Sequence, residues 1–307
     1  IEDSAVVAQV LLRTDSPSYP KRYNGRLVFP VGLFWTVLCT PEIESALSNR
    51  DIIRIGDVAV YEKAVIFRQF VEFFYQKRME AKAQGDDAHS LMYKLLMNSL
   101  YGKFGQAGRV FEDEQQSSEI RFGTWIEIDH ETREITRYRQ VANLIQRLAT
   151  ESESINSSPA IAAHVASAGR ALLARFITEA GPENVYYCDT DSLMVNDTGL
   201  GRLQPFMDTD RLGALKHERT VLSASIYGAK DYRLDGEAKI KGVRKKAVEI
   251  QPGVFEQDTF RGWKGMFHAG DVEHMLIKRT RKHLKRVYYK GIVEGPGRIQ
   301  PLRFSEE

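Results

Sequence analysis

Cysteine is scarce in this chain, since only Cys39 and Cys188 occur among 307 residues. Two distant cysteines form neither a disulfide framework nor a cysteine-based zinc site, so we expect a reducing compartment. No apolar run reaches the roughly 18 residues of a membrane span, which predicts that no segment crosses a bilayer. The first residues, Ile-Glu-Asp, lack an initiator Met and the charged and apolar regions of a signal peptide. We therefore expect the sequence to be a piece of a longer protein.

The chain also lacks a large excess of positive or negative charge, with 43 Lys and Arg against 41 Asp and Glu. The charge is unevenly spread, because residues 228–291 hold 16 basic and 8 acidic side chains. Such a basic block predicts a surface that faces a polyanion, although a solvated surface explains the charge alone equally well. The composition, 43% hydrophobic and 27% charged, is typical of a globular protein, and the length suits about two domains.

Hydrophobic periodicity predicts a mixture of strands and helices. Thr40 followed by Pro41 predicts an N-cap and a short helix that ends near Asn49. Residues 63–84 and roughly 88–101 have helical spacing, and so short a turn joins them that the two helices should lie antiparallel. The other predicted elements are strands at 5–12, 27–38 and 52–61, a loop at 13–26, a hairpin at 120–141, a helix from Pro159, and a strand–turn–strand unit at 185–195.

Two acids, Asp189 and Asp191, lie in the segment Tyr-Cys-Asp-Thr-Asp-Ser (187–192) between two apolar stretches. Burying such acids unpaired is costly, and a divalent cation would offset their charge. Carboxylates are suitable ligands for Mg²⁺, and two ions ~3.5–4 Å apart can activate a hydroxyl and stabilise a departing pyrophosphate. A bare Asp-x-Asp is more often a turn at a hairpin tip, so the functional interpretation depends on the complete six-residue pattern.

A second pattern lies on the predicted helix at 88–101, where Lys94, Asn98 and Tyr101 share one face. A lysine suits a triphosphate, and a tyrosine one turn further along can pack on a base or sugar. Taken alone, Lys94 would be a solvated surface lysine. Three leucines of the same helix are expected to pack elsewhere: Leu91, Leu95 and Leu96.

The preceding helix offers Arg78 and Lys82, one turn apart. Together with Lys94 they place three cations on the two adjacent predicted helices. The alternative is that Arg78 forms local surface ion pairs with Glu80 or Asp86.

The segment at 187–192 resembles the C motif of family B DNA polymerases, Tyr-x-Asp-Thr-Asp-Ser. Residues 94–105, Lys-Leu-Leu-Met-Asn-Ser-Leu-Tyr-Gly-Lys-Phe-Gly, resemble the B motif of the same family, Lys-x3-Asn-Ser-x-Tyr-Gly. The two motifs also stand in the family's order. The resemblance implies an α+β fold, a right-hand polymerase palm with an antiparallel sheet and packed helices, helical-hairpin fingers and a small thumb. It divides the chain into palm (1–62), fingers with the B motif (63–105), palm with a hairpin insertion and the C motif (106–228), and primer-binding strands with thumb (229–307).

The resemblance also implies roles for the motif residues. Asp191 and Asp189 become catalytic metal ligands for two Mg²⁺ ions, with Mn²⁺ as an alternative. The other implied roles are contact of Lys94, Arg78 and Lys82 with the triphosphate of a dNTP, lining of the nucleotide pocket by Asn98 and Tyr101, and contact of Gly102 with DNA.

The basic block contains Lys230-x-Tyr232, which resembles the family's Lys-x-Tyr element at the primer end. In an extended strand these two side chains would share one face. Lys241, within the basic segment 239–246, would follow the backbone of the primer-template duplex, although an exposed edge strand kept soluble by lysines is an alternative. The second basic run, 278–286, is expected in a thumb-like element or on a solvated helix face, and its histidine is not assigned a catalytic role.

The family's A motif, Asp-x2-Ser-Leu-Tyr-Pro, is not found, and Asp15-Ser-Pro-Ser-Tyr-Pro20 is only a superficial echo. We expect the chain to begin downstream of that motif and to be inactive alone, because one metal-binding carboxylate is lacking. The motif style favours phage, plasmid or mobile-element enzymes, some primed by a terminal protein and some independent of a primer. A cytoplasmic location in a bacterial or phage-infected cell is expected, with no membrane partner. Alternatives are a non-catalytic DNA-binding remnant and a metal-dependent nuclease.

Overall fold

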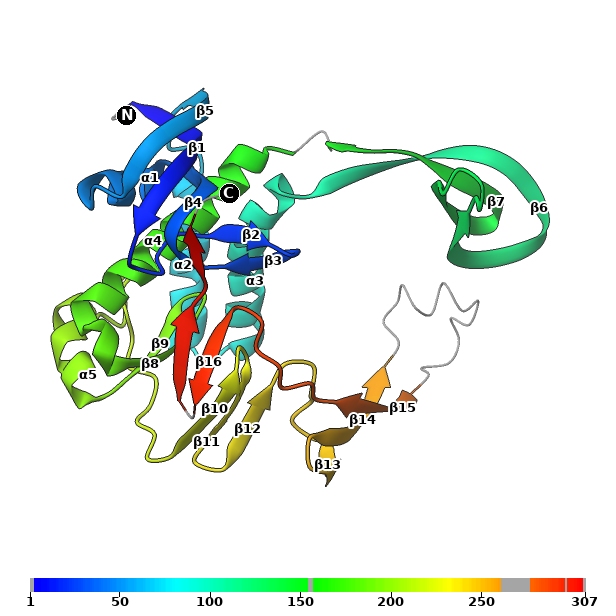
Figure 1. Cartoon of the computed structure of the whole chain (residues 1–307). Helices are drawn as coiled ribbons and strands as arrows, with labels where there is room; N and C mark the ends of the chain where they lie inside the picture. The colour runs from blue at the N-terminus through cyan, green and yellow to red at the C-terminus, as the bar shows by residue number, and fades with distance from the viewer. Residues whose placement is uncertain (1–2, 154–156, 261–276, 296, 306–307) are drawn as a thin grey trace. The chain divides into compact units, whose positions relative to one another are not determined.

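The computed structural model describes residues 3–153, 157–260, 277–295 and 297–305, which form two compact units. The first unit comprises residues 1–105, 158–238 and 287–307, and the second comprises residues 106–157 and 239–286. Helices and strands are mixed throughout (Figure 1), which confirms the predicted α+β class.

A four-stranded sheet with the order β18-β4-β1-β5 begins the first unit. Strand β1 (Ser4–Thr14) pairs antiparallel with both β4 (Val31–Cys39) and β5 (Ile52–Glu62). Strand β18 (Arg303–Ser305), at the far end of the chain, pairs parallel with β4. The predicted strands at 5–12 and 52–61 are confirmed, and the end of the chain returns to the first sheet.

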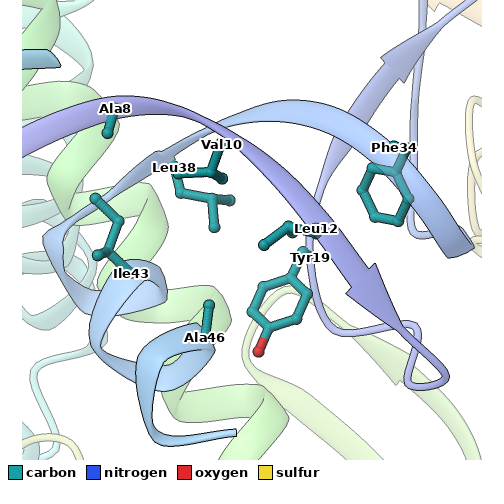
Figure 2. Packing of buried hydrophobic residues seen from close by; sticks show 8 residues of the cluster. All are labelled: Ala8, Val10, Leu12, Tyr19, Phe34, Leu38, Ile43 and Ala46. Carbon is teal, nitrogen blue, oxygen red and sulfur yellow. The ribbon is translucent and has the colours of Figure 1, made fainter. Parts of the chain in front are cut away.

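The main core lies between this sheet and helix α1 (Thr40–Ser48), as Figure 2 shows. The β1 residues of this core alternate along the strand, because successive side chains point to opposite faces, and Leu11 between them is buried as well. The residues of this cluster are Ala8, Val10, Leu12, Tyr19, Phe34, Leu38, Ile43 and Ala46. The Tyr19 hydroxyl donates to Asp51 Oδ2 at 2.7 Å, and burial raises the pKa of this phenol.

The start of α1 differs from the expectation. Cys39 occupies the N-cap position, and Thr40 is the first helical residue. The Thr40 hydroxyl instead accepts a hydrogen bond from the backbone N–H of Val6 at 2.7 Å, so tertiary contact with β1 replaces local capping. Residues 13–26 are also not entirely loop, because β2 (Lys21–Tyr23) pairs with β3 (Arg26–Val28).

Two long helices follow, α2 (Arg68–Ala83) and α3 (Asp87–Phe104), and they pack antiparallel as expected. The turn between them contains Gly85 at φ +73°, a left-handed conformation that favours glycine. The Asp86 side chain caps α3 by accepting a hydrogen bond from the backbone N–H of His89 at 3.0 Å. Facing aromatic rings join the helices, with Phe74 and Tyr93 centred 6.0 Å apart.

Helix α4 (Pro159–Ala180) starts at the predicted proline and packs against α1. Glu42 of α1 is 2% exposed, and Arg170 Nε of α4 approaches its carboxylate to 2.6 Å. The hydroxyl of Ser167 donates to the second carboxylate oxygen at 2.9 Å. Among the described residues, α4 is the one helix long and apolar enough to span a membrane, and one such helix is weak evidence for a membrane span.

Replacing Arg170 with Met should destabilise the protein by about 3 kcal/mol, because it leaves the Glu42 carboxylate buried without its cation. Urea denaturation followed by circular dichroism measures this loss. Lys77→Met removes an exposed ion pair with Glu80 and should leave the midpoint nearly unchanged. Equal midpoints for the Arg170→Met variant and the unmodified protein would contradict the claim that Arg170 stabilises the buried Glu42 carboxylate.

A second hydrophobic cluster holds strands β8 (Val185–Asp189) and β9 (Ser192–Val195) against the end of α4. Its buried members are Phe176, Ala180 and Leu203, the last from α5 (Asp197–Leu203). Short helices η1 (Pro182–Asn184) and η2 (Gln204–Phe206) flank these elements. One further sheet contains β10 (Ala224–Gly228), β11 (Asp231–Leu234) and β12 (Glu237–Ile240), whose last two residues are assigned to the second unit. Another contains β16 (Gly291–Gly295) and β17 (Arg298–Pro301).

The second unit contains a long hairpin of β6 (Ala107–Ile128) and β7 (Ile135–Glu153). The hairpin predicted at 120–141 is confirmed and is longer than expected. Trp125 and Tyr138 lie opposite each other in the register and stack with ring centroids 5.4 Å apart. The unit also contains a sheet of β13 (Val248–Gln251), β14 (Val254–Phe260) and β15 (Ile277–His283).

Candidate active site

A tight turn joins β8 to β9 and places Asp189 and Asp191 at the tip of the hairpin. Asp189 pairs with Ser192, and Thr190 between the two acids has φ +57°. The backbone N–H of Asp191 donates to the carbonyl of Asp189 at 2.6 Å. This pattern is a γ-turn with a left-handed central residue, a rare and strained conformation of the kind that concentrates at functional sites.

The two carboxylates of the turn are not equivalent. Asp189 accepts a hydrogen bond from the Thr190 hydroxyl at 3.0 Å, and its other oxygen lies 3.3 Å from Lys230 Nζ. Asp191 is exposed, and within the described part of the chain its carboxylate has no hydrogen bond or ion pair. Asp191 is therefore the carboxylate available to an external cation.

Lys230 is held beside this turn by its backbone as well as its side chain. Its N–H donates to the hydroxyl of Tyr187 at 2.8 Å, and the Tyr187 ring meets the buried Tyr232 edge to face at 5.3 Å. Burial is the main reason that the pKa of Tyr187 is raised. Lys230 lies before β11 at φ +59°, so the expectation that it shares a strand face with Tyr232 is wrong. Lys230 contacts both Tyr187 and Asp189 of the carboxylate hairpin, and Tyr232 contacts Tyr187.

Helix α3 presents the B-motif face to solvent, with Lys94, Asn98 and Tyr101 all exposed. The face toward α2 contains Tyr93 and Phe104, whose rings lie against aromatic rings of α2 and its N-cap. The leucines that were expected to pack elsewhere remain exposed: Leu91, Leu95 and Leu96. Both the polar residues of the motif and these leucines are thus accessible to solvent.

Arg78, Lys82 and Lys94 are brought into one electrostatic cluster. The pKa of Lys82 is lowered, first by the charge of Arg78, then by burial and by the charges of Lys216 and Lys94, against a weaker opposing effect of Asp210. Repulsion of this kind disfavours the charged form of a lysine, and a bound anion would relieve it.

Arg78 does not form the alternative surface pairs with nearby acids. Glu80 pairs with Lys77 at 2.8 Å, and Asp86 binds His89 at 2.6 Å. The Nε atom of Arg78 is buried, and no described group accepts its hydrogen bond. An unsatisfied buried donor is rare in a native protein, which favours a ligand at this position.

Gly102 lies within α3, where a glycine costs roughly 1 kcal/mol relative to alanine. A Cβ atom added to Gly102 would have no described heavy atom within 4 Å. Packing among the described residues therefore does not require this glycine.

The basic residues of the second unit are more dispersed. Lys241 is exposed and directly follows β12, an edge strand of its sheet. The run at 278–286 begins in strand β15, so a helix face is excluded for that part. Arg279 and Arg281 each approach an acid of β14 to 3.1 Å, which reduces the positive charge this run offers to a partner.

A family model described as "DNA polymerase type B, organellar and viral" matches residues 6–180. The chain belongs to this polymerase family. The match covers more than half of the chain and includes α2 and α3, but it ends before the carboxylate turn. The interpretation of Asp189 and Asp191 accordingly depends on their own motif and geometry.

Curated relatives of this type B polymerase chain come from a phage and from fungi. The DNA-directed DNA polymerase of Enterobacteria phage PRD1 is 31% identical over 193 residues, covering 62% of this chain and 33% of that protein. A probable DNA polymerase of Neurospora intermedia is 26% identical over 277 residues, covering 82% of this chain and 28% of that protein. The chain thus spans about a third or less of the length of these relatives.

A solved structure also resembles this polymerase chain. Phi29 DNA polymerase, in a complex with primer-template DNA and incoming nucleotide substrates, matches with a TM-score of 0.56 at 16% sequence identity. The match covers 92% of this chain and 51% of that one. It confirms the expected polymerase fold.

Proposed function

We propose that the protein containing this chain carries out template-directed DNA synthesis, transferring a nucleotide from a dNTP to a primer 3′-hydroxyl. The observation that carries this proposal is the cation cluster on α2 and α3, with its unsatisfied Arg78 Nε, in the same unit as the carboxylate turn. A polyphosphate supplies the anion that the cluster lacks. The free carboxylate of Asp191 supplies an oxygen ligand for the metal ions that such chemistry uses.

The donor chemistry of the turn fits Mg²⁺, with Mn²⁺ as an alternative, because both aspartates offer carboxylate oxygens on neighbouring positions. We assign Asp191 as the first ligand and Asp189 as the second acid, restrained by Lys230 at 3.3 Å. The bound ions would activate the attacking hydroxyl and neutralise charge on the leaving pyrophosphate. Among the described residues, no group of three or more His, Cys, Asp or Glu forms a complete metal site.

The exposed face of α3 and the neighbouring cations are assigned to the nucleotide. Lys94, Arg78 and Lys82 would bind the triphosphate by charge, and this contact orients the α-phosphate for attack. Asn98 and Tyr101, on the same face as Lys94, would line the pocket for base and sugar.

The primer-template is assigned to the residues around the hairpin and beyond it. Gly102 would allow close approach of DNA, and Lys230 and Tyr232, which both contact Tyr187, would hold the primer end. Lys241 would bind backbone phosphate, a contact that positions DNA without reading its sequence. We further propose that a terminal protein serves as the primer and that the protein acts in the cytoplasm of a bacterial or phage-infected cell.

Primer extension tests the proposal. The longest natural polypeptide that contains these residues should extend a primer in a template-directed, Mg²⁺-dependent way. Residues 1–307 alone should give no detectable extension, because the described carboxylate turn holds two acids and no third ligand. DNA binding without extension by the long polypeptide would instead favour a non-catalytic remnant, and degradation of single-stranded DNA would favour a nuclease.

A further inference from the structure

The loop at 207–216, which follows η2, is fixed at both of its ends. The backbone N–H of Leu215 donates to Phe206 O at 2.9 Å, and the N–H of Asp208 donates to Leu215 O at 2.9 Å. The Asp208 carboxylate also accepts the backbone N–H groups of Asp210 and Arg211 at 2.9 and 3.1 Å. Leu215 packs against the hydrophobic cluster that supports β8 and β9. These contacts therefore fix the backbone next to Lys216, the residue that follows Leu215.

This loop contacts the same face of α2 that carries the cations. The hydroxyl of Tyr75 donates to the backbone carbonyl of Asp210 at 3.0 Å. Tyr75 precedes Arg78 by three residues and Lys82 by seven, a spacing that places all three on one side of the helix. Tyr75 thus ties the loop to this side of α2, and Lys216, six residues after Asp210, is one of the charges that lower the pKa of Lys82.

The resulting group contains four cations, Arg78, Lys82, Lys94 and Lys216. Neither Lys82 nor Lys216 forms an ion pair or hydrogen bond with any residue that the structure describes, and Asp210 is the acid whose charge acts on Lys82. Bringing like charges together without counterions is unfavourable. A single phosphate of a DNA backbone carries one negative charge, whereas a nucleoside triphosphate carries about four. A polyphosphate therefore matches the group better than a DNA backbone phosphate.

We propose that Lys216 is a further triphosphate-binding residue, which acts from the 207–216 loop together with the cations of α2 and α3. This inference rests on the proposed function and extends it, because it adds a contact that the B motif does not contain. Lys216 would bind phosphate oxygens from the side of the loop, and the restrained backbone would reduce the entropy lost on binding. The same contact would bind the pyrophosphate product.

The test uses three variants of the longest natural polypeptide containing these residues. Lys216→Gln should raise the KM for dNTP about tenfold with a smaller change in kcat, and weaken tripolyphosphate binding about tenfold in calorimetry. Lys216→Arg retains the charge and should restore most of both. Arg211→Gln is the matched control, because it removes an exposed cation of the same loop that lies 4.0 Å from Asp208. It should leave both measurements unchanged.

Unchanged KM and tripolyphosphate affinity in Lys216→Gln would overturn the inference. So would weaker primer-template binding with normal nucleotide binding, since that result assigns Lys216 to DNA. A protein that binds tripolyphosphate through Lys216 yet never extends a primer would refute the proposed function and support this inference. An unchanged melting temperature of Lys216→Gln shows that the loss is not a folding defect.

Discussion

Replacing Asp191 with Asn should lower templated nucleotide incorporation by about 10³-fold in the longest natural polypeptide that contains these residues. The substitution keeps the size of the side chain and removes the negative charge that would hold a metal ion. Because the Asp191 carboxylate has no partner among the described residues, the change breaks no internal hydrogen bond or ion pair of that group. Single-turnover incorporation with saturating DNA and dNTP measures the effect on the chemical step.

Asp197→Asn is the matched control for this experiment. Asp197 is an exposed acid in the first turn of α5, a few residues after the same hairpin. Its replacement should leave incorporation essentially unchanged. Incorporation by Asp191→Asn within about threefold of the unmodified enzyme would refute its assignment as a metal ligand. The result is interpretable only if primer-template affinity and melting temperature stay unchanged, and both are expected to do so.

Replacing Lys94 with Gln should lower kcat/KM for dNTP by about 10²-fold, because the triphosphate loses a cation at a position where negative charge develops. Lys94 is exposed on the motif face of α3 and takes part in the cation cluster around Lys82. Steady-state incorporation as a function of dNTP concentration measures the loss. The affinity for primer-template DNA should remain normal.

Lys77→Gln controls for the loss of any lysine near this pair of helices. Lys77 lies on α2 beside Arg78 and is already paired with Glu80 at 2.8 Å. We expect its kcat/KM to stay near that of the unmodified enzyme. An equal loss in Lys77→Gln and Lys94→Gln would show that general surface charge, rather than a specific phosphate contact, is responsible.

Much of the local structure was predictable because it follows from hydrophobic periodicity and chain breakers. The strand at 5–12, the helix that Pro159 opens, and the antiparallel α2 and α3 are all confirmed. Thr40 shows the limit of this reasoning, since its hydroxyl binds the backbone of Val6 in β1 rather than its own helix. A residue's local propensity gives no information on a partner 34 positions away.

The site shows the same division between local features, which the sequence predicts, and long-range contacts, which it does not. Sequence spacing alone placed Lys94, Asn98 and Tyr101 on one helix face, and the two aspartates at a turn between strands. The unequal environments of Asp189 and Asp191 could not be predicted, because the partner Lys230 comes from a turn more than thirty residues later. The expectation that Lys230 and Tyr232 share a strand face failed for a different reason, because the left-handed backbone of Lys230 places it outside the strand.

The sequence by itself determined the family and the residue types of the site, because motif spacing is local and specific. Tertiary structure alone decided which charges meet. The Tyr75 contact ties the 207–216 loop to α2 and adds Lys216 to the cluster of Arg78, Lys82 and Lys94. Electrostatic interaction depends on distance in space, and no local pattern in a chain of 307 residues encodes that distance.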